Sequence, residues 1–141
     1  MKRNASAVWN GGLKDGKGVI STDSGVLSNT QYSFATRFEN GIGTNPEELI
    51  AAAHAGCFSM QLSALLEKAG LTAASINTKA ALTMEKTDEG FTITAVHLDV
   101  KAKVPGATQQ QFDTAASTAK AGCPVSRVLR ADITMDAKLE S

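Results

Sequence analysis

Cysteine is scarce in this chain, and the scarcity limits how the fold can be stabilised. Only Cys57 and Cys123 occur among 141 residues, so no network of disulfides can hold the molecule together. A domain of this length buries roughly two thirds of its unfolded surface and needs no such bridge. In a cytosolic protein, two cysteines this far apart are more typical of a metal site or a redox couple. Both thiols are therefore candidate functional groups.

The chain also lacks an excess of either charge. Lysine and arginine together number 14, as do aspartate and glutamate. A balanced charge gives no electrostatic reason to expect nucleic acid or an anionic membrane as a partner. It also gives little repulsion between copies, so self-association is a fair expectation.

Neither a secretion signal nor a membrane anchor is indicated. The N-terminus, Met1–Ser6, carries charges with no apolar run behind them. The one long apolar stretch, Leu49–Leu66, contains His54 and Gln61 and is flanked by charged residues, which favours a core helix over a membrane span. We predict a soluble, cytoplasmic protein.

The apolar pattern predicts a single α+β domain over residues 1–141. The expected elements are short antiparallel strands within 2–38, a helix from Pro46 to Gly70, a hairpin over 76–104, a helix from Thr108 to Gly122, a short helix from Pro124 and a last strand over 133–139. Thr44 or Asn45 is the expected cap of the first helix. A face switch between Ile93 and Val96 indicates a bulge. This order of elements is typical of an antiparallel sheet with helices on it.

The first long helix is apolar on nearly every side. Ile50, Phe58, Met60 and Leu66 point in different directions around it. Such a helix needs burial all round, and one chain of this size covers only part of it. A two-fold partner is the economical cover, which predicts a homodimer.

Cys57 lies within this helix, and its surroundings allow two interpretations. In an apolar wall the pKa of a thiol rises and the cysteine is inert. Activation requires a fixed cation, and Arg37, expected at the end of a strand before the helix, is a candidate that a carboxylate such as Glu47 would hold in place. The alternative for Arg37 is a surface ion pair. About 15 Å of helix separates Glu47 from Cys57, so an intermediary or a second subunit must bridge them.

Cys123 precedes Pro124 at the start of the short helix, where the helix dipole lowers the pKa of a thiol. The residues alone therefore do not decide which sulfur attacks. His54 is either a base for Cys57 or a satisfied core histidine. A zinc site built from His54, Cys57, His97 and Cys123 has suitable ligand types but no CxxC pair. A module that binds apolar ligands, with Cys57 as an inert wall residue, is a further alternative.

Three blocks of sequence carry a resemblance to a known family. They are Arg37-Phe38-Glu39, the run from Gly43 through Asn45-Pro46-Glu47-Glu48-Leu49 and His54-Ala55-Gly56-Cys57 to Met60, and Ala121-Gly122-Cys123-Pro124-Val125-Ser126. In this order they resemble the OsmC family, the osmotically inducible branch of the OsmC/Ohr thiol peroxidases. The likeness extends over the whole chain, and the position of the arginine just before the helix is similar to the OsmC branch.

The resemblance implies a fold and a chemistry. The implied fold is an intertwined homodimer in which antiparallel sheets enclose long central helices. Cys57 matches the peroxidatic cysteine, Cys123 the resolving one, and Arg37 and Glu47 the activating pair. The family uses no metal or organic cofactor, and its members reduce organic hydroperoxides, and hydrogen peroxide less well, with electrons from dithiols such as lipoylated proteins. We expect Phe58 and Met60 to contribute an apolar wall for alkyl peroxides.

Overall fold

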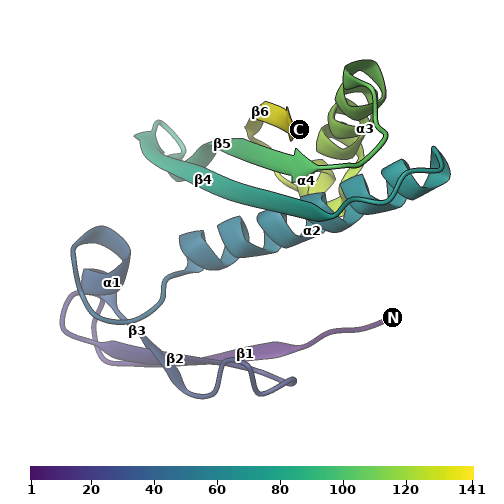
Figure 1. Ribbon diagram of the computed structural model, residues 1–141. Helices are drawn as coiled ribbons and strands as arrows, with labels where there is room; N and C mark the ends of the chain where they lie inside the picture. Colours follow the sequence, from purple (N-terminus) through teal and green to yellow (C-terminus); the bar gives the residue numbers. More distant parts are fainter. The chain divides into compact units, whose positions relative to one another are not determined.

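The chain folds into two compact units, Met1–Leu49 and Ile50–Ser141. A computed structural model describes all 141 residues and shows helices and strands in both units, so the α+β class is confirmed (Figure 1). The prediction of one domain over 1–141 stays a prediction.

The N-terminal unit is built on a small antiparallel sheet. Its strands are β1 (Ala5–Asn10), β2 (Lys17–Thr22) and β3 (Thr30–Tyr32), in the order β1-β2-β3. The rings of Trp9 and Tyr32 lie 5.4 Å apart on this sheet. Gly18 sits against both rings, and a Cβ there would overlap them, so this position requires glycine.

A short helix, α1 (Phe34–Phe38), follows the sheet where the sequence predicts strand. The prediction was wrong because it weighed the aromatic residues as strand formers. The hydroxyl of Ser33 accepts the N–H of Thr36 and the Thr36 hydroxyl accepts the N–H of Ser33, at 3.3 and 2.8 Å. This reciprocal cap starts the helix. Phe34 and Phe38 then stack one turn apart, with ring centroids at 4.8 Å.

Helix α2 (Pro46–Lys68) is the longest element and follows the predicted boundaries. The Asn45 side chain accepts the N–H of Glu48 at 2.8 Å, so Asn45 is the cap and Pro46 takes the first helical position. Beyond the last turn, Gly70 adopts a φ of +78°, the left-handed conformation that commonly ends a helix.

The C-terminal unit contains a second three-stranded sheet. Its strands are β4 (Ser75–Thr87), β5 (Gly90–Lys103) and β6 (Asp132–Glu140), in the order β4-β5-β6. The predicted hairpin and the predicted face switch are both confirmed, because Thr83 pairs with Ala95 whereas Met84 pairs with Ile93. One extra residue on β5 therefore forms a bulge.

The purely antiparallel sheet of the prediction is wrong at its last strand. β6 pairs with β5 in parallel, in register from Ala95–Asp132 to Lys103–Glu140. A parallel pair needs a crossover of a dozen or more residues. Helices α3 (Gln109–Gly122) and α4 (Pro124–Val128) supply that crossover.

The apolar core lies on one face of the β4-β5-β6 sheet. Its fully buried residues come from α2, β5 and α3 and include Phe58, Leu62, Leu66, Val96, Leu98, Val100, Phe112 and Ala119. The buried residues of α2 are His54, Phe58, Leu62 and Leu66, each four positions after the last, so the chain buries a single stripe of that helix. All core residues belong to the C-terminal unit.

Helix α2 is also long and apolar enough, by length and composition alone, to cross a membrane. Of its most apolar stretch, 22% is buried within the chain. The apolar positions outside the stripe therefore need a second cover.

Candidate active site

The C-terminal unit brings the two cysteines together. Cys57 lies in the middle of α2, and Cys123 lies at the junction of α3 and α4, yet their sulfurs are 3.1 Å apart. Both thiols are free; Cys57 is half-buried and Cys123 has no exposed surface. A disulfide requires about 2.05 Å between the sulfurs, so a small movement joins them.

Cys123 is stabilised as a thiolate by the first turn of α4. Its sulfur is the N-cap acceptor and receives the N–H of Ser126 at 3.5 Å. Burial acts to raise the pKa of Cys123, but the hydrogen bonds that its sulfur accepts from the Ser126 backbone, from Cys57, from the Ser126 side chain and from the Val125 backbone together lower it. The effect predicted from the position before Pro124 is confirmed.

The pKa of Cys57 shifts in the opposite direction. Burial raises the pKa of the Cys57 thiol, a bond from the Val125 backbone opposes this, and the neighbouring Cys123 raises it further. Across the 3.1 Å contact the geometry allows Cys123 Sγ to donate to Cys57 Sγ, whereas the pKa directions of the two thiols favour the reverse. Because Cys123 already accepts from Ser126, we assign the proton to Cys57. Within its own unit, then, Cys57 is the protonated member of the pair.

His54 occupies the turn of α2 before Cys57 and is fully buried. Its Nε2 lies 2.7 Å from the hydroxyl of Ser126, whereas its Nδ1 has no partner. Its hydrogen-bond partner is thus Ser126 rather than Cys57. Burial lowers the pKa of His54, so the imidazole is neutral near pH 7.

The buried imidazole predicts an acid-dependent loss of stability. The unfolded chain binds a proton at His54 below about pH 6.5, while the native state does so only at lower pH. The free energy of unfolding should therefore fall by up to about 1.4 kcal/mol per pH unit between pH 6.5 and the native pKa. Urea denaturation from pH 7.5 to 5 measures this slope, and His54→Gln should flatten it. His97→Gln is the matched control, and an equal flattening in that variant would contradict the assignment.

The second histidine does not join the cysteines. On the β5–β6 pair, His97 contacts the Thr134 hydroxyl at 2.6 Å and the Asp136 carboxylate at 3.1 Å. No group of three or more His, Cys, Asp or Glu side chains is arranged to hold a metal ion. The zinc site considered from His54, Cys57, His97 and Cys123 is not formed.

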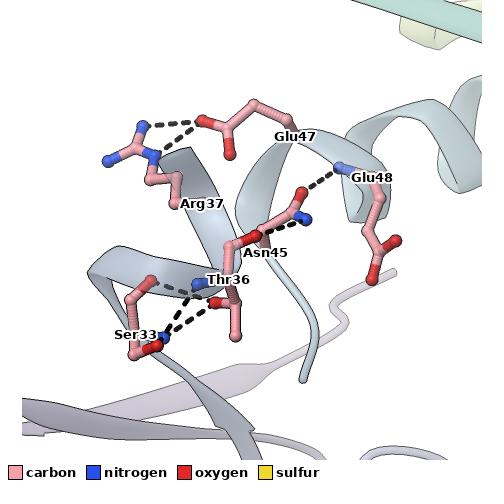
Figure 2. Close-up of polar contacts among 6 residues, drawn as sticks. All are labelled: Ser33, Thr36, Arg37, Asn45, Glu47 and Glu48. Atoms are coloured by element: carbon pink, nitrogen blue, oxygen red, sulfur yellow. Dashed lines mark hydrogen bonds and ion pairs between the residues drawn. The ribbon is translucent and has the colours of Figure 1, made fainter. Parts of the chain in front are cut away.

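The N-terminal unit contains the other predicted pair, Arg37 and Glu47 (Figure 2). Both Nε and Nη2 of Arg37 bind the same Glu47 oxygen, Oε1, at 2.8 and 2.7 Å. The second oxygen, Oε2, is buried without a partner. The guanidinium also stacks over the ring of Phe38, 5.3 Å from its centroid. The predicted contact is thus formed, although Arg37 belongs to α1 and not to a strand.

Hydrogen bonds hold α1 against the start of α2. The Asn45 amide donates to the carbonyl of Thr36 at 3.1 Å (Figure 2). The Thr44 hydroxyl donates to the Glu48 carboxylate at 2.7 Å and secures the loop before α2. Because Asn45 also caps α2, one side chain sets both the helix start and the position of α1. This fixes the two backbone segments that carry Arg37 and Glu47.

An apolar pocket of about 280 Å³ adjoins the arginine in the same unit. Half of its lining residues are aromatic, and the lining consists of Trp9, Leu13, Tyr32, Ser33, Phe34, Arg37, Phe38 and Pro46. The pocket thus places one cation at the wall of an apolar cavity.

The structure adds groups that the sequence did not single out. The backbone N–H groups of Val125 and Ser126 contact the sulfurs, and the Ser126 hydroxyl contacts His54. The sequence did contain a signal for Ser126. It is the third residue of the helix that begins after Cys123, and an N-cap side chain accepts the N–H at that position. Phe58, expected in a substrate wall, is instead fully buried in the core.

Comparison with known proteins identifies the family of the chain. The model of the family described as OsmC-like protein matches residues 39–138. A peroxiredoxin OsmC of Escherichia coli (strain K12) is 52% identical over 141 residues, covering 100% of this chain and 99% of the relative. The organic hydroperoxide resistance protein OhrB of Bacillus subtilis (strain 168) is 32% identical over 124 residues, covering 87% and 88%.

Solved structures of OsmC-like proteins share this fold. The structure of an OsmC-like protein from Mycoplasma pneumoniae superposes with a TM-score of 0.78 at 15% identity, over 100% of this chain and 99% of that one. Two sheets, a long helix and a close pair of thiols define a dithiol protein of the OsmC-like fold. The chain belongs to the OsmC family.

Proposed function

We propose that this protein reduces organic hydroperoxides to alcohols, with Cys57 as the attacking sulfur and Cys123 as the resolving one. The class of activity, a cysteine-based peroxidase, follows from family membership and from the identity to a peroxiredoxin. The observation that carries the proposal is the 3.1 Å contact between two free thiols of unequal exposure and unequal pKa.

The first step oxidises Cys57. Its thiolate attacks the distal peroxide oxygen, the O–O bond breaks, and the departing alkoxide takes a proton and leaves as the alcohol. The sulfur loses two electrons and becomes a sulfenic acid. Cys57 is the better candidate for this step because it is half-exposed, whereas Cys123 has no surface through which a peroxide can reach it.

The second step forms the disulfide. The Cys123 thiolate attacks the sulfenic sulfur, the S–S bond forms, the S–O bond breaks, and hydroxide leaves as water after taking a proton. The lowered pKa of Cys123 supports this role because it keeps the second sulfur ready as a nucleophile. A dithiol, such as a lipoylated protein, then supplies two electrons and two protons that restore both thiols.

Arg37 is the proposed source of the cation that ionises Cys57. Burial raises the pKa of Cys57, and within its unit only the Val125 backbone bond opposes that rise. A guanidinium would supply the missing stabilisation, and Glu47 would keep it oriented. Glu47 contacts Arg37 through one oxygen, Oε1. Most of the five N–H donors of the guanidinium therefore stay available for the sulfur or the substrate.

Arg37→Ala tests this role. The second-order rate constant for cumene hydroperoxide at pH 7 should fall about 10- to 100-fold, because each 1.4 kcal/mol of lost thiolate stabilisation costs about tenfold. The pH–rate profile should move to higher pH. Arg3→Ala removes the same charge from the N-terminus and serves as the control. If the pH–rate profile of Arg37→Ala were the same as that of the wild type, Arg37 would not belong to the site.

The aromatic pocket beside Arg37 supports organic hydroperoxides as substrates. Its volume of about 280 Å³ suits an aryl or medium alkyl group, and its lining offers apolar surface. Hydrogen peroxide has no apolar group to place there, so it should react less well. This pocket replaces the wall expected from Phe58.

An intertwined homodimer is the proposed assembly. The chain buries one stripe of α2, and Met60 on another face remains 78% exposed. The N-terminal unit contributes no buried apolar residue to the core, and a unit of this size rarely folds on its own core. A second copy would cover both surfaces. Size-exclusion chromatography with light scattering should give the mass of two chains.

We also propose a cytoplasmic location and a role in oxidative and osmotic stress defence. The polar residues within α2, such as His54 and Gln61, support a soluble protein. A dithiol that cycles through reduction requires a compartment with a supply of reduced thiols.

One experiment tests the proposed function directly. The reduced protein is titrated with one equivalent of cumene hydroperoxide, and free thiols are counted together with cumyl alcohol. The expected result is one alcohol formed and two thiols lost per chain. Survival of both thiols would refute the mechanism.

A further inference from the structure

The buried His54 and the half-buried Ser126 form a polar contact that the proposed chemistry does not use. The histidine is 0% exposed and makes one side-chain hydrogen bond, 2.7 Å from its Nε2 to the serine hydroxyl, while its Nδ1 has none. Burying a polar group that is incompletely paired carries a desolvation penalty that no hydrogen bond offsets. An apolar pair of the same volume would stabilise the core more, so the contact needs another explanation.

The contact joins the same two segments as the sulfurs. His54 lies three residues before Cys57 on α2, and Ser126 lies three residues after Cys123 in the first turn of α4. Residues 72 positions apart are thereby linked beside the 3.1 Å contact of the thiols. The hydrogen bond therefore joins the same two segments that the disulfide would join.

Ser126 acts on Cys123 through its backbone as well. Its N–H donates to the Cys123 sulfur at 3.5 Å, while its hydroxyl contacts His54. None of the five residues of α4 is fully buried, so core packing alone holds this short helix only loosely. A polar link to the rigid, buried side of α2 supplies the missing restraint.

We propose that His54 and Ser126 are positioning residues that hold Cys123 in reach of Cys57 for disulfide closure. The inference rests on the proposed function, since it concerns the second step of that cycle. The sulfenic acid of Cys57 has two fates. Attack by Cys123 breaks the S–O bond and releases water, whereas a second hydroperoxide transfers its oxygen to the sulfur, releases another alcohol and leaves sulfinic acid. The histidine–serine contact favours closure over this second oxidation.

Ser126→Ala tests the inference against Ser126→Thr, which retains the hydroxyl. With ten equivalents of cumene hydroperoxide, mass spectrometry should find mostly disulfide in the wild type and a severalfold larger sulfinic fraction in Ser126→Ala. The threonine variant should restore the wild-type ratio. Ser59→Ala is the matched control, because it removes a hydroxyl that lies 2.7 Å from the Thr78 hydroxyl in the same unit. A wild-type ratio in Ser126→Ala, or the same change in Ser59→Ala, would overturn the inference.

A second measurement separates this inference from the peroxidase proposal. Ellman's reagent labels the half-exposed Cys57 as a mixed disulfide, and Cys123 then displaces the aromatic thiolate and forms the same S–S bond without any peroxide. Stopped-flow absorbance gives the rate of that second release, which should fall about tenfold in Ser126→Ala and in His54→Gln. A reduced closing rate in a protein that does not consume peroxide would refute the proposed function and leave the positioning role standing. Equal closing rates in all variants would refute the positioning role alone.

Discussion

Cys57→Ser is expected to abolish hydroperoxide reduction. A serine hydroxyl is not ionised near pH 7 and has no stable oxidised state equivalent to a sulfenic acid. The remaining thiol, Cys123, is fully buried and cannot meet the substrate. The rate of cumene hydroperoxide consumption with dithiothreitol should fall by about a thousandfold or more, which corresponds to about 4 kcal/mol of barrier. Circular dichroism checks that the variant is folded.

The alternative is that Cys123 attacks the peroxide, because Cys123 is the more acidic thiol of the pair. If Cys57→Ser retained peroxidase activity and the variant at Cys123 lost it in single turnover, the two sulfurs would exchange roles. Local structure would then have to open to admit the peroxide to Cys123. Single-turnover kinetics of both variants therefore assign the attacking sulfur without reference to any relative.

Cys123→Ser should separate the two steps of the cycle. The first turnover should proceed, since the attacking sulfur and the apolar pocket are intact. Without a resolving thiol the sulfenic acid persists, and excess peroxide should convert it to sulfinic acid, which thiols do not reduce. Sustained turnover should fall about 100-fold or more after the first equivalent, as for other losses of a reacting group.

Mass spectrometry of Cys123→Ser measures this outcome. Trapping with dimedone should detect the sulfenic acid after one equivalent of peroxide, and the sulfinic mass should dominate after ten. Ser63→Ala, which changes a hydroxyl on α2, is a suitable folding control. Full turnover of Cys123→Ser with a dithiol would mean that the external reductant attacks Cys57 directly and that Cys123 has no resolving role.

Local signals predicted much of the fold. Asn45 and Pro46 define the start of α2, and the reciprocal cap of Thr108 and Gln111 defines the start of α3. The face switch before Val96 predicted the bulge in β5. Each of these features depends on residues close together in the chain, so the sequence contains the whole of the physical cause.

The missed features depend on contacts between distant residues or on competition between local signals. The parallel pairing of β6 is decided by how the α3–α4 crossover returns to the sheet, which no strand pattern records. At α1 the cap of Ser33 and Thr36 outweighed the strand preference of Phe34. The contact between His54 and Ser126 spans 72 positions, and the sequence shows only two polar residues near two cysteines.

Both predicted site pairs are formed, each within a different unit of the chain. The thiols meet in the C-terminal unit, and Arg37 meets Glu47 in the N-terminal one. Glu47 was singled out as the carboxylate that would hold Arg37, and that contact is formed. The catalytic roles of all four residues stay predictions, and the variants above test those of Cys57, Cys123 and Arg37.

The way in which Arg37 binds Glu47 also limits what evolution or an engineer can place at position 37. Two of the three guanidinium nitrogens share a single carboxylate oxygen, so Nη1 has no bond to that carboxylate. Lysine carries one ammonium group, and an ion pair with Glu47 would occupy it as a point charge with no fixed second donor. An exchange of arginine for lysine would thus preserve the net charge and still remove the fixed donors that the guanidinium keeps beyond its contact with Glu47.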